Sequence, residues 1–450
     1  MNTKSNIVYF ILVVIVLAQT GLQAQTFSDL YDFDNLYAST TNATQIEPSG
    51  DLIISAGVLY GVTYQGGSNS QGGLYSINPD GTDFKALYSF KDSASRRLTL
   101  LSGILYAPIF PGSTAGGNIV SVDTNGGPSH VIHQFTGTGE GVFPTGIASA
   151  GNMLFGTTMF SNSYSGPGTI YSINTNDDSF TVLHTFNQTQ AGQWLTVSGG
   201  TLYGAASSDS ATASPTNNVL FSIATNGDNY TNLYTFTDGA LAGWLIINRG
   251  MIYGLGLSNT PPNYAGGSGG YVFSIETNGS NFSVLHVFTI SPNGLTLLND
   301  NLLCGASIAD GLYNGGTIYS MSTNGSGYNV LYNFPEYRGS GFAGASGLVS
   351  DGNTLLGTTQ EGGTNEWGSI YSLNLAPTIQ SVTSTNGYLN MVWNAASGAY
   401  YKTQYSTNIS CTNWLDLGGI FTATNQTISI MDPIIGTQRF YRLIYQPSSN

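Results

Sequence analysis

Charged side chains are scarce in this sequence of 450 residues. Only 8% of the residues are charged, and 10 basic side chains stand against 24 acidic ones, which gives a formal net charge of -14. Affinity for nucleic acid depends on Lys and Arg neutralising phosphates, and an acidic surface repels them. We therefore expect neither DNA nor RNA as a partner.

Cysteine is almost absent, because the chain holds only Cys304 and Cys411. The two residues lie on opposite sides of the domain boundary proposed below. A framework of disulfides, which stabilises many small exported domains, is therefore not expected here.

Long apolar runs are missing beyond the N-terminus. The single run, residues 7–18, follows Lys4 and precedes Leu22-Gln23-Ala24, a pattern typical of an export signal that is cleaved after Ala24. An uncleaved membrane anchor is the alternative, but the run is shorter than the roughly 20 residues that cross a bilayer. We expect residues 1–24 to be a signal peptide, and the mature protein to be secreted or associated with the cell surface, without a membrane segment.

Glycine and aromatic residues, in contrast, are plentiful. The chain has 59 Gly, 28 Tyr and 21 Phe, and 41% of its residues are hydrophobic. Such a chain has enough apolar material to fold, while the glycine content and the scarcity of charge argue against a helix-rich or coiled-coil protein. The composition favours an all-β protein.

A repeat of about 50 residues runs through most of the chain, and three landmarks mark it. The first is a Leu-Tyr-Gly type element in seven copies, centred on Tyr60, Tyr106, Phe155, Tyr203, Tyr253, Cys304 and Leu356. The second is a Tyr-Ser-Ile type element, also in seven copies, at Tyr75, Val120, Tyr171, Phe221, Phe273, Tyr319 and Tyr371. The third is Leu-Tyr-x-Phe, which has only six copies, ending at Phe90, Phe135, Phe186, Phe236, Phe288 and Phe334.

Each repeat resolves into four short strands, as the fourth copy shows. Its strands are predicted at residues 195–198, 201–205, 219–224 and 230–236, which are rich in β-branched and aromatic residues. Gly199-Gly200 and Asn226-Gly227 supply hairpin turns, because both central residues of such turns must tolerate positive φ. Four antiparallel strands that repeat about every 50 residues are typical of a β-propeller blade. We predict a seven-bladed β-propeller over residues 25–375.

The missing seventh copy of Leu-Tyr-x-Phe indicates how the ring closes. Residues 30–33, Leu-Tyr-Asp-Phe, match the missing element at the other end of the chain. An N-terminal strand that completes the last blade would remove the open sheet edges. An open solenoid of the same units is the alternative, and it would leave this strand without a partner.

A second domain is expected over residues 376–450, where the repeat is lost after Leu375-Ala376-Pro377. Strands are predicted at residues 379–384, 388–393, 400–406, 414–417, 427–431 and 438–445. Six short strands in about 70 residues suggest a small β-sandwich.

Two family resemblances rest on these segments. Gly347 to Thr359, followed by Glu361-Gly362-Gly363 and Gly368 to Ser372, resembles the GloVer tandem repeat of bacterial "choice-of-anchor" proteins, in seven copies over about residues 51–373. That resemblance implies an exported repeat protein and no established activity, and this chain shows no recognisable sorting tail. Residues 401–408, Trp414 and Phe440 to Leu443 resemble the fibronectin type III-like modules of secreted bacterial proteins.

Residues that could carry chemistry mostly recur in equivalent positions of the repeats. His133, His184 and His286 stand where sister repeats have Tyr, so we expect half-buried aromatic residues, and His130 alone makes no metal site. The strand serines that follow the second landmark, one in every repeat, fit a structural element with no paired His. Asp80 and Asp177 lie in predicted turns, which Asp favours, although calcium is an alternative there. We predict no metal site, no cofactor and no catalytic residue.

One position is exceptional. Nine residues before the first landmark stand Asp51, Arg97, Trp194 and Trp244, and at the remaining copies Gly146, Gly347 and, after a one-residue insertion, Gly294. This position should ring the channel mouth at the start of the innermost strands, on the same face as the long loops between the second and third strands. Two Trp beside an Arg and an Asp can stack on a sugar and hydrogen-bond to it. Alternatively, Trp194 and Trp244 simply plug the channel.

The function predicted from these observations is a non-catalytic binding or scaffold module whose mouth binds carbohydrate or a cell-surface protein. The alternative is a propeller-type carbohydrate-active enzyme, a glycoside hydrolase or a polysaccharide lyase. Glycoside hydrolysis needs paired carboxylates roughly 5 to 10 Å apart, and Asp51 is the only acid that the pattern places at the mouth.

Overall fold

The computed structural model describes residues 26–33, 45–93, 97–110, 116–137, 139–161, 166–187, 190–208, 218–237, 241–257, 269–290, 292–298, 301–308, 310–335, 345–375, 377, 379–395, 400–407, 414–423, 427–434 and 439–446. Within these ranges the structure is all-β, without a helix. No described helix is long and apolar enough to cross a membrane. The predicted signal peptide and Cys411 lie outside the described residues.

The described repeats form four-stranded antiparallel sheets. The first two are β2 (Gln45–Ser55), β3 (Val58–Gly66), β4 (Gly73–Ile77) and β5 (Lys85–Ser89), then β6 (Thr99–Leu101), β7 (Ile104–Ile109), β8 (Asn118–Asp123) and β9 (His130–Gln134). The third and fourth are β10 (Val142–Ala150), β11 (Met153–Phe160), β12 (Thr169–Asn174) and β13 (Ser179–Thr185), then β14 (Gln190–Ser198), β15 (Thr201–Ser208), β16 (Asn218–Ala224) and β17 (Thr231–Phe236). The fifth and sixth are β18 (Leu241–Asn248), β19 (Met251–Leu257), β20 (Gly270–Glu276) and β21 (Ser283–Phe288), then β22 (Pro292–Leu298), β23 (Leu302–Ser307), β24 (Thr317–Ser322) and β25 (Asn329–Asn333).

The last of these sheets takes a strand from each end of the repeat region. β26 (Ala345–Asp351), β27 (Thr354–Thr359) and β28 (Ser369–Asn374) are joined by β1 (Thr26–Asp32), in the order β1-β28-β27-β26. The register pairs Thr26 with Asn374 and Asp32 with Ser369. The strand predicted at residues 30–33 therefore pairs with the seventh repeat and begins four residues earlier than expected.

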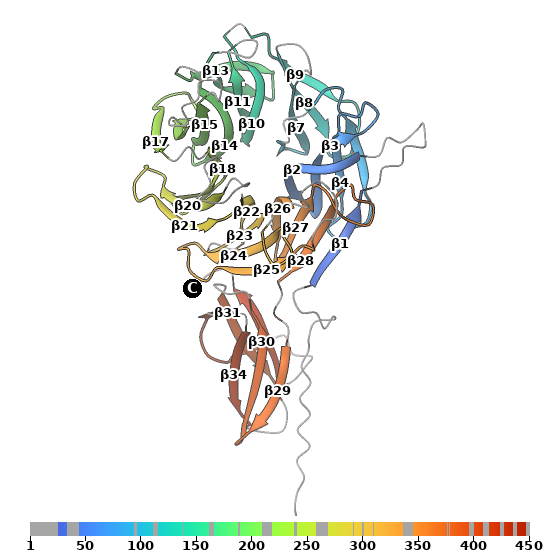
Figure 1. Ribbon diagram of the computed structural model, residues 1–450, viewed down its shortest axis with the longest axis vertical. Helices are drawn as coiled ribbons and strands as arrows, with labels where there is room; N and C mark the ends of the chain where they lie inside the picture. The colour runs from blue at the N-terminus through green and yellow to red at the C-terminus, as the bar shows by residue number, and fades with distance from the viewer. Residues whose placement is uncertain are drawn as a thin grey trace, which may run out of the picture.

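The sheets surround a common centre (Figure 1), and their innermost strands are β2, β6, β10, β14, β18, β22 and β26. From β6 to β26 each inner strand contacts the next, and β26 of the last sheet contacts β2 of the first. All four strands predicted for the fourth repeat are present, and β14 begins five residues before its predicted start. The extra residues include a β-bulge, which the sequence pattern did not reveal.

A close approach within each sheet explains the glycine of the first landmark. At Gly61, Gly156, Gly305 and Gly357, an added Cβ would collide with the ring of a tyrosine on the neighbouring strand, Tyr75, Tyr171, Tyr319 or Tyr371. These four rings are fully buried, and their hydroxyls have no hydrogen-bond partner among the described residues. Phe221 and Phe273 occupy the same place against Gly204 and Gly254.

Stacked rings join neighbouring sheets at their outer strands. We call these contacts the peripheral pairs: Tyr31–Phe84, His133–Phe180, His184–Tyr230, Tyr234–Phe282, His286–Tyr328 and Phe27–Tyr332. Their ring centroids lie 3.8 to 4.2 Å apart, with interplanar angles of 5 to 8°. The prediction of half-buried aromatic histidines is thus confirmed at all three positions. Burial lowers the pKa of each of these histidines.

Both faces of the N-terminal strand β1 take part in this pattern. Phe27 stacks on Tyr332 of the sixth sheet, and Tyr31 stacks on Phe84 of the first. Between the first and second sheets, by contrast, Ser129 stands where the other sheets have the second ring of a pair, and the described residues show no such stack there.

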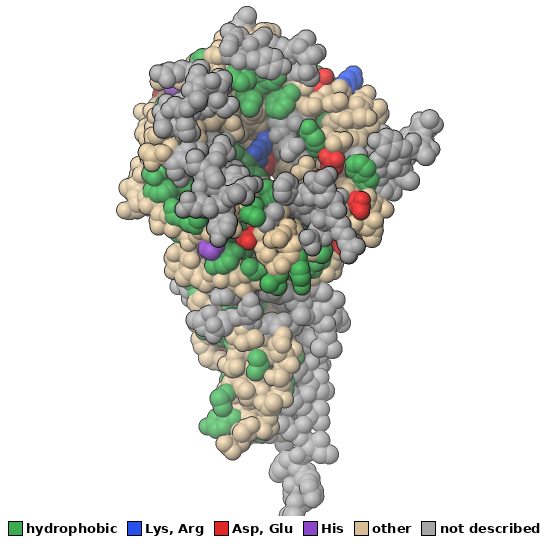
Figure 2. All heavy atoms as spheres, viewed as in Figure 1, with side chains coloured by type: hydrophobic (Ala, Val, Ile, Leu, Met, Phe, Trp, Pro, Cys, Tyr) green, Lys and Arg blue, Asp and Glu red, His purple; other side chains and the backbone are tan. Residues whose placement is uncertain are grey.

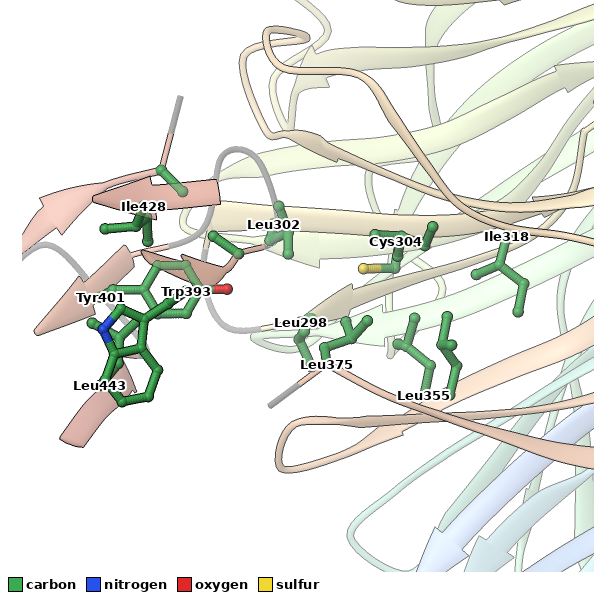
Figure 3. Packing of buried hydrophobic residues seen from close by; sticks show 14 of the residues in the cluster. Leu298, Leu302, Cys304, Ile318, Leu355, Leu375, Trp393, Tyr401, Ile428 and Leu443 are labelled. Carbon is green, nitrogen blue, oxygen red and sulfur yellow. The ribbon is translucent and has the colours of Figure 1, made fainter. Parts of the chain in front are cut away.

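The C-terminal strands form two further sheets at one end of the molecule (Figure 1). One holds β29 (Ile379–Thr385), β30 (Tyr388–Asn394) and β34 (Thr427–Pro433); the other holds β31 (Tyr400–Ser406), β32 (Leu415–Asp416), β33 (Phe421–Thr422) and β35 (Phe440–Gln446). The six predicted strands are all present, and the short β33 was not predicted. Trp393, Tyr401 and Leu443 are buried between the two sheets, in a cluster that continues through Leu375 and Leu298 into the repeat region (Figure 3).

Candidate functional site

The exceptional position of the repeat lies at a β-bulge in every described innermost strand except β6, which begins two residues after Arg97. In β14, Gly192 pairs with Ala206 and Trp194 with Ala205, so one extra residue is inserted between them. In β26 the shift falls between Ser346 and Leu348, with Gly347 as the inserted residue. The prediction that this position begins the strand is therefore wrong in most sheets, because the inner strands start several residues earlier and continue through the bulge.

This position faces the centre of the molecule, where the sheets surround a hollow that is open to solvent (Figure 2) and has a volume of about 240 Å³. Asp51, Arg97, Trp194 and Trp244 all line it, with Gly146, Gly347 and Leu295 from other sheets. The four residues come from four sheets and lie up to 193 positions apart in the sequence. The repeat pattern therefore identified side chains that meet at one place.

An ion pair lies at the charged side of the cavity. Arg97 Nη1 donates to Asp51 Oδ1 at 2.9 Å, and the backbone N–H of Leu98 donates to Asp51 Oδ2 at 3.3 Å. The side chains of Arg97 and Asp51 retain 16% and 26% of their exposed surface. Each charge is therefore neutralised within the site, while both side chains remain in reach of a ligand.

The two tryptophans support this ion pair. The guanidinium of Arg97 lies 2.9 Å above the ring centroid of Trp194 and 5.5 Å from that of Trp244. The two indole rings are 4.4 Å apart and tilted by 41°. Trp194 also lies against Gly243, where an added Cβ would come within 2.9 Å of its indole nitrogen. One face of Trp194 is thus used inside the protein, in a cation–π contact that orients Arg97.

Trp244 holds an unfavourable backbone conformation. Its φ is 47°, in the left-handed region, and at the corresponding bulges Gly294 and Gly347 have φ of 77° and 50°. Glycine adopts this region freely, whereas a bulky residue is a genuine outlier there, at a cost of about 1 to 3 kcal/mol. Strained residues cluster at functional sites, so the strain at Trp244 makes this position a candidate.

The other candidates do not gather into a site. Of the described residues, no three His, Cys, Asp or Glu are grouped as a metal ion would need. Asp80 and Asp177 hydrogen-bond within their own turns, to Thr82 and Ser179. Cys304 is free and buried in the hydrophobic core, where burial raises the pKa of its thiol.

A second cavity, of about 450 Å³, was not foreseen from the sequence. It lies where β1 meets the first and last sheets, and Asp29, Asp80, Ser372 and Asn374 are among its lining. Burial and the neighbouring Asp32 raise the pKa of Asp29. The lining comes from β1, from the last sheet and from the turn between β4 and β5, which meet only in the folded structure, so no local sequence signal could have indicated it.

Comparison with solved structures shows what this fold resembles. An oligogalacturonate lyase in complex with manganese superimposes with a TM-score of 0.51 at 12% identity, covering 78% of this chain and 96% of that one. The oligogalacturonate lyase from Vibrio parahaemolyticus gives 0.51 at 10% identity over 78% and 97%, and the GH74 enzyme of Niastella koreensis gives 0.52 at 12% over 82% and 59%. No family model and no curated protein matches the chain. At such identities the likeness establishes the fold alone: this is an all-β, β-propeller-like protein.

Proposed function

We propose that the chain is an exported, closed seven-bladed propeller that recognises a ligand without transforming it, at the central cavity lined by Asp51, Arg97, Trp194 and Trp244. The bound partner is a carbohydrate or a cell-surface protein. The observation that carries the proposal is the convergence of these four side chains from four sheets on one cavity, with Trp244 in a strained conformation.

Closure is supported by the contacts of β1 and of the inner strands. β1 completes the sheet of β26, β27 and β28, and β26 contacts β2. Phe27 and Tyr31 extend the peripheral pairs to both neighbouring sheets. In an open solenoid the first and last repeats would be far apart, and these three sets of contacts would not form.

Export and the two family assignments belong to the same proposal. The apolar run that ends before Leu22-Gln23-Ala24 supports a signal peptide over residues 1–24. The seven repeats support membership of the GloVer repeat proteins, and the two C-terminal sheets around Trp393 support a fibronectin type III-like module at residues 376–450. Mass spectrometry of protein recovered from the medium or cell surface should give Gln25 as the first residue; an intact Met1 would contradict cleavage.

A non-catalytic role is favoured by the chemistry of the cavity. Asp51 is the one carboxylate among the described residues that line it, and it already accepts hydrogen bonds from Arg97 and Leu98. General acid and base catalysis of glycoside cleavage needs two carboxylates in different environments. The site offers instead an aromatic surface with one fixed donor group and one fixed acceptor group.

A glycan array screen of residues 25–450, beside the Trp194→Ala, Trp244→Ala double variant, tests this function. Specific binding that disappears in a variant with nearly unchanged melting would support a recognition site. If the double variant instead loses several kcal/mol of stability and the native protein binds no glycan, the tryptophans plug the channel. Release of product from any bound glycan would support the enzymatic alternative.

A further inference from the structure

The charge of the central cavity differs from that of the domain around it. Residues 25–375 hold 22 acidic and six basic side chains, so an anionic ligand approaches against a repulsive field. Inside the cavity the only ionisable groups among the described lining residues are Asp51 and Arg97, and their charges cancel in the ion pair. Neither the site nor its surroundings therefore favours a carboxylated or sulfated ligand.

The size and shape of the cavity restrict the ligand further. Its volume of about 240 Å³ lies below the roughly 300 to 1,000 Å³ of pockets for drug-sized ligands, so it has room for one small ring. Trp244 lines the cavity and is only half-buried, so part of its indole is apolar surface within reach of a ligand. The Arg97–Asp51 pair places N–H donors beside carboxylate acceptors. A pyranose has complementary parts: an apolar C–H face, and hydroxyls that both donate and accept.

We propose that the cavity binds a single neutral sugar ring, the end of an uncharged glycan, with Trp244 as the stacking residue and the Arg97–Asp51 pair as the hydroxyl-binding group. This inference rests on the proposed function and names its ligand class. Trp194 acts as a positioning residue, because its ring holds the Arg97 guanidinium in place.

The strain at Trp244 provides a sharp variant for the test. Trp244→Gly restores the residue that the sixth and seventh sheets carry at the same bulge, so the backbone is relieved while the stacking ring is lost. A matched control is Trp414→Ala, which removes a tryptophan stacked on Arg442 in the C-terminal sheets, away from the cavity. Both variants are made in residues 25–450.

The experiment measures binding of a paired panel, neutral hexose glycans and uronic-acid glycans of equal length, at low and high salt. We expect only the neutral members to bind, with little salt dependence, because no net charge is neutralised. Trp244→Gly should weaken binding about ten-fold while its melting temperature stays level or rises, and Trp414→Ala should bind as the native protein does.

The outcomes that overturn the inference are distinct from those that overturn the function. If uronic-acid glycans alone bind, and Trp244→Gly abolishes that binding, the recognition site stands and the neutral ligand class is wrong. If neutral glycans bind equally well to Trp244→Gly, the cavity is not their site, and the inference falls. If no glycan binds, the inference is wrong. The proposed function then requires a cell-surface protein that binds the native chain and does not bind the Trp244→Gly variant.

Discussion

The repeat region and the C-terminal sheets are both antiparallel β-structure, yet their stabilising contacts differ. The repeat region uses one aromatic contact again and again, the peripheral pairs, together with a tyrosine or phenylalanine against a strand glycine. The C-terminal sheets instead use single polar contacts: Asp432 is buried and accepts hydrogen bonds from Arg439 and from Tyr441, the latter at 2.6 Å.

The two regions also differ in their balance of charge. Residues 376–450 hold three basic and two acidic side chains, and each of the three basic groups has a partner: Lys402 pairs with Asp416, Arg439 with Asp432, and Arg442 with Gln404 and Trp414. Repetition thus distributes stability over many equivalent junctions, whereas the small C-terminal unit concentrates it in a few pairs. Single substitutions should therefore have a larger effect in the C-terminal sheets than in the repeat region.

Removal of the N-terminal strand should have the largest effect. Deleting residues 26–34 takes away the pairing of β1 with β28 and two peripheral pairs at once. We expect a strong loss of stability, visible in thermal unfolding of the repeat region, because the edges of β28 become exposed. Phe27→Ala serves as a milder control that leaves the strand pairing intact. Unchanged unfolding of the deletion variant would contradict closure by β1.

Removal of the buried carboxylate of Asp432 should cause the second-largest loss of stability. Asp432→Ala leaves the Arg439 guanidinium and the Tyr441 hydroxyl without their shared acceptor. Breaking such a pair costs about 3 to 5 kcal/mol, and we expect about 3 here, because Arg439 keeps some contact with solvent. Denaturant titration followed by fluorescence measures it, with Asp416→Ala, at an exposed pair, as the control. Equal effects of the two substitutions would contradict the contrast between buried and exposed pairs.

A tyrosine hydroxyl in the repeat region should have a smaller effect, and of opposite sign. Tyr171 is fully buried, and within the part of the chain that the structure describes its hydroxyl has no hydrogen-bond partner. Phe221 fills the same place in the next sheet. Tyr171→Phe should therefore stabilise the protein by about 1 kcal/mol, because an unsatisfied buried polar group costs about 1 to 3 kcal/mol. The reciprocal Phe221→Tyr should destabilise it. A destabilising Tyr171→Phe would indicate a buried partner for that hydroxyl.

The weakest expected effect is a dependence of stability on pH. Burial lowers the pKa of His133, His184 and His286, so the unfolded chain binds protons at a higher pH than the folded one. Stability should consequently fall as pH drops below about 6.5, the ordinary histidine pKa, until the folded-state values are passed. The triple substitution to Tyr, as in Tyr234, should flatten melting temperature between pH 7 and 5. If the melting temperature of the triple variant depends on pH as strongly as that of the native protein, the dependence comes from carboxylates and not from these histidines.

Much of the fold could be predicted because the repeat exposes it. Three landmarks defined the strands, and the absence of the third after Leu373 located the partner of β1. The C-terminal strands followed from alternating apolar residues and turns. The bulge in the inner strands could not be predicted, because two-residue periodicity contains no sign of an inserted residue until the pairing register is known.

The candidate site was predicted as a ring of unusual residue types at the channel mouth, without the contacts among them. Counting back from the first landmark found Asp51, Arg97, Trp194 and Trp244, since a fixed offset in a repeat maps to a fixed place in each sheet. Their roles depended on contacts across sheets: Arg97 stacks on Trp194 and pairs with Asp51. The positive φ of Trp244 is likewise visible only in three dimensions.

The pairing of β1 with β28 also sets the order of events during synthesis. Asp29 and Tyr371 are register partners, yet more than 300 residues separate them along the chain, so this contact is among the most non-local in the molecule. Non-local strand pairing forms slowly, because a long loop must close before any contact rewards it. β1 is therefore synthesised long before β28, the last strand of the repeat region, and has no sheet partner until then. A helper protein that shields an unpaired strand would have its natural target in residues 26–32 during that interval.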